Sequence, residues 1–142
     1  LPAVSNDAGL EAALKETVAK ADAAMCALDF QGGIMAIMDF CKQVNGYVTI
    51  KEPWILAKDP ANQGVLEEVL YNTAESLRAL AVLLHPVMPQ TCEILWQSLG
   101  AQAVLGDLSA QKISDVATWG QLPQGATVTK TPVLFPRLET PA

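Results

Sequence analysis

A chain of 142 residues, 51% of them apolar and only 6% aromatic, is long enough for one packed domain and favours helices over a sheet. The formal net charge of −6 excludes a protein that binds nucleic acid mainly through a basic surface, because the surface as a whole repels phosphate backbones. If this chain binds RNA, recognition has to be local, through base stacking and contacts to base edges.

The three cysteines do not form a metal or disulfide motif. Cys26, Cys41 and Cys92 are odd in number, widely spaced and without a C-x-x-C pair. Because they fall on the apolar faces of predicted helices, we expect buried, reduced thiols in a cytoplasmic protein.

No segment of the sequence is long and apolar enough to span a bilayer. The longest apolar run, residues 77–84, contains Arg78 and is too short, so no membrane partner is expected. The chain starts at Leu1 without a methionine and shows no basic-then-apolar leader. We therefore interpret it as a fragment of a longer protein.

The first predicted helix covers residues 7–28, where apolar residues recur at helical spacing as far as Leu28. Ser5 or Asn6 is expected to cap this helix, with Asp7 favourable near its positive end.

A second apolar stripe predicts a helix that begins at residues 29–30. The Gly32–Gly33 pair weakens its start by roughly 1 kcal/mol per glycine relative to alanine. A close crossing of two helices would explain why glycine is used at this point.

Pro53 is expected to end the second helix. A proline lacks the amide donor and disfavours helix in the residue before it, so the helix should end near Lys51 or Glu52. Pro53 can then be the first residue of a new short helix. Trp54 therefore lies at a corner between two helices, where an indole can be half buried and half presented to a partner.

A third helix follows a turn at residues 59–62 and is expected to have Asn62 as its cap. Its apolar face is wider than a surface helix needs, so this helix should be the most buried one. We expect Arg78 to face outward from it. His85, just before the next proline, is interpreted as a histidine near the negative end of the helix dipole.

A fourth helix is predicted over residues 89–99. Residues 107–125 then form a mostly polar loop, and residues 131–138 are extended by their prolines. Four isolated apolar residues anchor the loop: Ile113, Val116, Trp119 and Leu122.

The predicted fold is all-α, an antiparallel bundle of roughly four to five helices with an extended C-terminal tail. We expect residues 1–106 to form the bundle. Residues 107–142 form the loop and tail, which pack on the bundle or on another domain. Phe135 and Leu138, together with Trp119, are interpreted as apolar anchors of this tail.

Three stretches of the sequence, in this order, carry a family resemblance. The phrase Asn-x-Tyr followed by Pro-Trp-x-Leu-Ala-Lys lies within residues 45–58, a Pro-x-Met-Pro turn lies within residues 70–96, and Leu-Phe-Pro-Arg-Leu-Glu occupies residues 134–139. Together they resemble the anticodon-binding domain of methionyl-tRNA synthetases, and the resemblance covers about residues 30–139.

The resemblance implies that the parent protein is an enzyme that attaches methionine to tRNA using ATP with Mg²⁺. This fragment would help to recognise the CAU anticodon of tRNA(Met). Its implied partners are the anticodon loop and the catalytic domain of the same chain, not DNA. The family's remaining anticodon readers, an asparagine and an arginine, lie on a helix that precedes this region, so we expect the bundle to lack its first helix.

We expect no catalytic residue, cofactor site or metal site in the fragment itself. It has no glycine-rich phosphate loop preceded by a strand, and neither the His-x-Gly-His nor the Lys-Met-Ser-Lys-Ser motif through which class I synthetases bind ATP. Its single histidine, His85, cannot assemble a triad or a zinc cluster within the chain.

The resemblance also selects candidate anticodon-binding residues. Trp54 is either a corner tryptophan of the fold or the platform that stacks on the first anticodon base, a cytosine. Asn45 and Tyr47 either hydrogen-bond a base or orient the corner. Lys51 and Lys58 either contact phosphates or are ordinary solvated lysines.

Two alternative interpretations remain open at this point. The valine, isoleucine, leucine and cysteine enzymes share the helical architecture, so the chain belongs either to methionyl-tRNA synthetase or to another class I synthetase. A helical protein-interaction bundle without a nucleic-acid role would also fit the acidic charge and the scattered basic residues.

Overall fold

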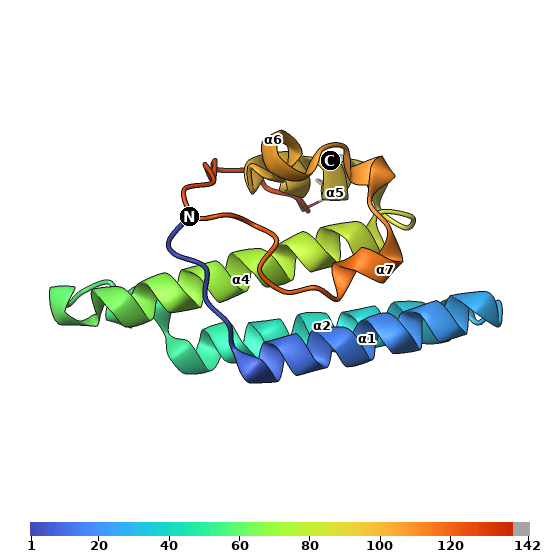
Figure 1. Cartoon of the computed structure of the whole chain (residues 1–142), viewed down its shortest axis with the longest axis horizontal. Helices are drawn as coiled ribbons and strands as arrows, with labels where there is room; N and C mark the ends of the chain where they lie inside the picture. The colour runs from blue at the N-terminus through green and yellow to red at the C-terminus, as the bar shows by residue number, and fades with distance from the viewer. Residues whose placement is uncertain (138–142) are drawn as a thin grey trace, which may run out of the picture.

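A hairpin of two long helices forms one side of the molecule (Figure 1). In the computed structural model, which describes residues 1–137, the hairpin consists of α1 (Ala8–Cys26) and α2 (Phe30–Lys51). The long helix α4 (Gln63–Leu84) runs back antiparallel to α2 and packs against it. Two short elements connect α2 to α4: α3 (Pro53–Leu56) and the 3-10 turn η1 (Pro60–Asn62).

Helices α5 (Pro89–Ser98) and α6 (Ala101–Leu105) lie on the other side of α4 in the view of Figure 1. The 3-10 turn η2 (Leu108–Ala110) follows them, and α7 (Ile113–Val116) contacts both α4 and α1. The segment after α7 returns across α4 toward the N-terminus. The predicted all-α bundle is thus confirmed over the described residues. However, the predicted polar loop over residues 107–125 contains two short helical elements, η2 and α7.

The cap of α1 is Asp7, not Ser5 or Asn6 as the sequence suggested. The Asp7 carboxylate accepts hydrogen bonds from the backbone N–H groups of Gly9 and Leu10, both at 3.0 Å. Asp7 takes this position because an aspartate directly before the first helical turn both caps it and complements the helix dipole.

The two glycines at the start of α2 have different roles. Gly32 leaves room for the cap, because its N–H donates to the Asp29 carboxylate at 2.9 Å and an added Cβ would clash with that carboxylate. Gly33 is buried, and a Cβ there would lie 2.8 Å from the Met25 side chain of α1. The close helix crossing is therefore found at Gly33. Leu28 lies outside α1, with φ of 62° and 74% of its surface exposed.

Helix α4 is the most buried helix, as predicted, but its polar residues are buried too. Arg78 is 1% exposed and Glu75 is fully buried, and their side chains form an ion pair at 2.8 Å. The expectation that Arg78 faces outward is therefore wrong. Asn62 occupies the N-cap position of α4, but its side chain makes no capping hydrogen bond.

Glu75 and Arg78 are buried because together they hold the segment that follows α7. The Arg78 guanidinium donates to the carbonyl oxygens of Val116 and Thr118, at 3.1 and 3.2 Å. The Glu75 carboxylate accepts from the backbone N–H groups of three successive residues at 3.0 to 3.1 Å. These donors belong to Gly120, Gln121 and Leu122. A buried ion pair persists only when such additional hydrogen bonds satisfy both partners.

Of the predicted loop anchors, Val116 and Leu122 are buried in the core, whereas Ile113 is 36% exposed. Trp119 is partly buried, and its indole N–H donates to the carbonyl of Ser5 at 3.0 Å. The tail from residue 131 to 137 contains no helix, as predicted.

Phe135 is 66% exposed and thus does not anchor the tail in the bundle core. Leu138 lies outside the described residues. Cys92 is buried, but Cys26 is exposed at the end of α1, contrary to the expectation of buried thiols. Within residues 1–137, no helix combines the length and the apolar character that a membrane span requires.

Candidate nucleic-acid interface

The corner between α2 and α3 is built as the position of Pro53 predicts. Helix α2 ends at Lys51, and Glu52 adopts the left-handed conformation with φ of 45° and ψ of 58°. Pro53 then occupies the first turn of α3, where its missing N–H costs no hydrogen bond. The left-handed conformation of Glu52 turns the chain sharply. Trp54 therefore belongs to the new helix α3 and not to an extension of α2.

Trp54 is 53% exposed, and its neighbour Ile55 is 45% exposed. In contrast, Trp96 is fully buried and Trp119 is partly buried. Helix α3, which carries Trp54, packs on α4, and this contact fixes the corner on the bundle. The predicted half-exposed indole is therefore confirmed, and it presents an aromatic surface to which a flat partner can bind.

Two candidate residues precede the corner on α2: Asn45 is exposed, and Tyr47 is held by a hydrogen bond from α4. Asn45 is exposed, and its backbone carbonyl accepts a hydrogen bond from the Thr49 hydroxyl at 2.8 Å. Tyr47 is half-buried, and its hydroxyl accepts a hydrogen bond from Asn72 Nδ2 of α4 at 3.3 Å. Burial raises the pKa of the Tyr47 hydroxyl above the ordinary tyrosine value.

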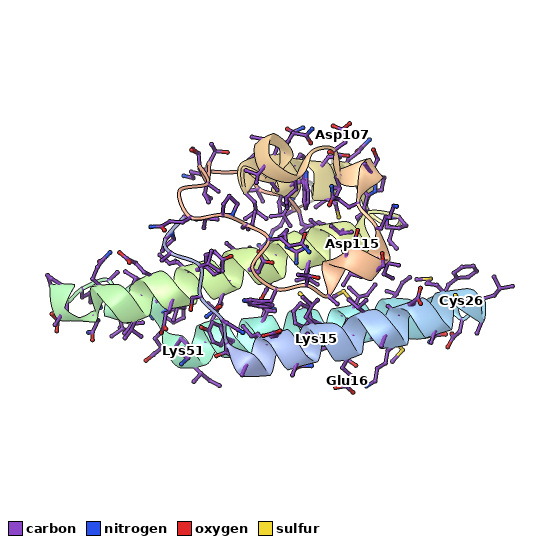
Figure 2. The ribbon with its side chains drawn as sticks, in the orientation of Figure 1. Lys15, Glu16, Cys26, Lys51, Asp107 and Asp115 are labelled. Atoms are coloured by element: carbon purple, nitrogen blue, oxygen red, sulfur yellow. The ribbon has the colours of Figure 1, made fainter. Side chains whose placement is uncertain are left out.

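Lys51 and Lys58 are both exposed, one on each side of Trp54 in the chain. Figure 2 shows Lys51 at the end of the molecule where α2 finishes, far from Cys26 at the opposite end. The Lys51 ammonium lies 5.6 Å from the centre of the Tyr47 ring, within the range of a cation–π contact.

The lysines of the corner differ from those along the helical hairpin. Lys15, Lys20 and Lys42 each form an ion pair with a carboxylate one turn away on the same helix. Within the described part of the chain, neither Lys51 nor Lys58 forms an ion pair. The two corner cations are therefore available to an external anion.

The corner is nevertheless no basic patch. Lys51 is followed directly by Glu52, and Lys58 by Asp59, whose carboxylate caps η1 through the N–H of Ala61 at 2.9 Å. Such a balance gives little long-range attraction to RNA. Recognition at this surface has to depend on the indole and on individual contacts.

No metal site accompanies the corner: residues 1–137 hold no cluster of His, Cys, Asp or Glu that suits a metal ion. His85 lies at the C-terminal end of α4, with Nε2 at 3.5 Å from a carboxylate oxygen of Glu93.

Sequence reasoning missed Asn72, which is 3% exposed and holds Tyr47. An asparagine inside the widest apolar face of the sequence was the available signal, since a buried amide needs a partner.

Residues 7–128 match the family model described as the anticodon-binding domain of tRNA ligase. The methionine–tRNA ligase of Streptomyces coelicolor is 55% identical, over 98% of this chain and 27% of that protein. The methionine–tRNA ligase of Bacillus subtilis is 36% identical, over 94% of this chain and 19% of that protein.

Among solved structures, the free form of Mycobacterium tuberculosis methionyl-tRNA synthetase superposes with a TM-score of 0.74 at 26% identity. The match covers 99% of this chain and 28% of that one. The chain thus spans about a quarter of the Streptomyces and Mycobacterium relatives that it matches. The family-model match and the shared helical architecture show that this chain belongs to the anticodon-binding domain family of tRNA ligases.

Proposed function

We propose that this chain is the anticodon-binding domain of a methionine–tRNA ligase and that it recognises the CAU anticodon of tRNA(Met). The identity to named methionine–tRNA ligases supports methionine over the other amino acids. The observation that carries the RNA-binding role is the exposed indole of Trp54 at the proline corner.

Trp54 provides the stacking platform for the first anticodon base, cytosine. Stacking of an unpaired base on an aromatic side chain contributes about 1–3 kcal/mol and is well suited to an acidic domain, because it does not depend on net charge. Asn45 offers an exposed amide to a base edge, and Lys51 and Lys58 offer cations to the phosphates of the loop.

The chemistry belongs to the catalytic domain of the same parent chain, where ATP and Mg²⁺ activate methionine. One of the similar structures, from Mycobacterium tuberculosis, is described as a complex with methionyl-adenylate, which supports this assignment for the parent. The fragment alone is expected to be inactive in aminoacylation. We place the complete ligase in the cytoplasm, in keeping with the free thiols of this chain.

We further propose that residues 1–106 form the bundle and that a helix upstream of Leu1 in the ligase completes it. A groove of about 430 Å³ between α4, α5 and the tail segment 128–135 is lined mainly by apolar side chains. A second groove of about 370 Å³, which Leu1 and Pro2 also line, adjoins it through Leu77, Leu99 and Val128. Leu70 in the second groove is 46% exposed. A helix with one apolar face would cover both grooves.

The test uses the complete ligase and anticodon stem-loops that carry either CAU or a changed first base. Trp54→Ala should weaken binding of the CAU stem-loop by about 5- to 100-fold, as expected for loss of one stacked base, and should reduce the preference for the first-position cytosine. Ile55→Ala is the matched control, since Ile55 is an exposed apolar neighbour on the same short helix.

Two other results would change the assignment. If Trp54→Ala leaves affinity and preference unaltered, the chain is an interaction bundle rather than an RNA-binding domain. If the ligase prefers a different anticodon in the wild-type form, the chain belongs to another class I synthetase.

A further inference from the structure

The proposed interface leaves one feature unexplained, a buried asparagine beside it. Asn72 is 3% exposed, its Nδ2 donates to the Tyr47 hydroxyl, and its buried Oδ1 has no hydrogen-bond partner within the described residues. An unsatisfied buried carbonyl oxygen is destabilising, and an apolar residue of similar size would avoid the cost. Asn72 is therefore less stabilising than an apolar residue would be at this position. Its side-chain amide donates a hydrogen bond to the Tyr47 hydroxyl.

Tyr47 connects this buried amide to the exposed corner. Its hydroxyl is held by Asn72 of α4, and its ring faces the Lys51 ammonium at 5.6 Å, one turn further along α2. The hydroxyl accepts from Asn72, so the ring cannot rotate outward without breaking a hydrogen bond between two helices. The contact with the ring restricts the long side chain of Lys51, which has no carboxylate partner within the described residues.

We propose that Tyr47 is a positioning residue of the RNA interface, and this inference rests on the proposed function. Fixed by Asn72, the Tyr47 ring holds the Lys51 ammonium at the corner, where it contacts one phosphate of the anticodon loop. Tyr47 itself acts through Lys51 and does not read a base.

The arrangement distinguishes the two lysines of the corner. Lys51 is held by an aromatic ring that is itself tied to α4, whereas Lys58 lies beyond α3 and, within residues 1–137, makes neither a hydrogen bond nor a cation–π contact with Tyr47 or Asn72. A phosphate contact made by Lys51 should therefore depend on Tyr47, and one made by Lys58 should not.

The experiment measures binding of the CAU stem-loop to the complete ligase as a function of salt concentration. Lys51→Gln should lower the slope of log affinity against log salt by about 0.7, the value for one phosphate contact on a single strand. Tyr47→Leu should lower it by the same amount, and the double variant should show no further loss, because both changes remove one contact. The matched control is Tyr47→Leu combined with Lys58→Gln, whose effects should add.

A second measurement separates positioning from a structural role. Asn72→Leu should leave the thermal midpoint unchanged or raised, yet weaken binding of the stem-loop by about 3- to 10-fold through loss of the tie to Tyr47. Tyr47→Phe keeps the ring but removes the hydroxyl that Asn72 holds, so it should weaken binding of the stem-loop by a factor similar to that of Asn72→Leu.

The proposal is wrong if Tyr47→Leu and Lys51→Gln weaken binding additively, or if Asn72→Leu leaves affinity unchanged. These results are distinguishable from failure of the proposed function. If the proposed function itself is wrong, Trp54→Ala would also leave the preference for the first anticodon base unaltered.

Discussion

Buried polar side chains decide more of this structure than the apolar pattern reveals. The local sequence offers Arg78 one partner, Glu75, which lies one turn earlier on α4 and forms an ion pair with it. The rest of the guanidinium is satisfied by the carbonyls of Val116 and Thr118, far along the chain. Periodicity reports which face of a helix is buried, but it does not report a hydrogen-bond partner supplied by a distant loop. The buried position of Arg78 was therefore not predictable from the sequence.

Removal of the Glu75 charge is expected to be severe. Glu75→Gln leaves the buried Arg78 cation without its carboxylate and replaces one of the two oxygens that accept from the segment after α7 with an amide donor. The free energy of unfolding should fall by about 3–5 kcal/mol, measured by urea denaturation. Glu16→Gln, which removes the exposed pair with Lys20, is the control and should cause no measurable change. A small effect of Glu75→Gln would show that the ion pair does not hold this segment.

Tyr71 should make stability depend on alkaline pH. Its hydroxyl donates to the carbonyl of Leu122 at 2.7 Å, and burial raises the pKa of Tyr71 from 10.0 to about 12. Because the unfolded chain releases this proton first, the contribution of Tyr71 is fully present below pH 10.0 and is lost as the pH rises toward about 12. In urea titrations, Tyr71→Phe should flatten the decline of stability over this interval. A decline as steep as that of the wild type would contradict the assignment.

Helix boundaries were predictable where a local rule decides them. Pro53 ends α2 and starts α3 through a local effect that does not depend on tertiary contacts. The corner that carries Trp54 could therefore be located from the sequence. The start of α1 was less certain, because Ser5, Asn6 and Asp7 all suit an N-cap. The short helices η2 and α7 have too few residues for a periodic signal.

The assignment of the α1 cap leads to a direct test. Asp7→Ala should reduce the free energy of unfolding by about 1 kcal/mol, since two N–H groups of the first turn lose their acceptor. Ser5→Ala should have little effect, because the carbonyl of Ser5 accepts from Trp119 through the backbone. Equal losses in both variants, measured by thermal or urea unfolding, would contradict this assignment.

At the scale of the whole molecule, the exposed indole follows the C-terminal end of α2, and the apolar grooves lie along α4. At this scale, the burial predicted from the sequence and the burial in the structure differ most at the grooves. Leu70 and Leu77 belong to the wide apolar face predicted for α4, yet Leu70 is 46% exposed. The prediction that this face is buried needs a covering element, which we assign to the ligase upstream of this chain.

The covering helix can be tested by a pair of substitutions on α4. Leu70 and Val65 are equally exposed at 46%, but only Leu70 lines the groove. In the complete ligase, Leu70→Ser should destabilise the domain by about 1 kcal/mol or more relative to Val65→Ser, because it removes buried apolar surface. In the present chain the two variants should differ little. Equal effects in the complete ligase would show that the groove remains open to solvent.

Contact between the Trp54 indole and the anticodon is measured most directly by fluorine NMR of the ligase labelled with 5-fluorotryptophan. Trp54→Phe assigns the Trp54 resonance, and Trp96 and Trp119, buried and partly buried, serve as internal references. Saturation with a CAU stem-loop should shift the Trp54 resonance and leave those two in place, and a stem-loop with a changed first base should shift it less. A Trp54 resonance that stays in place at saturation would contradict the proposed recognition of tRNA by this domain.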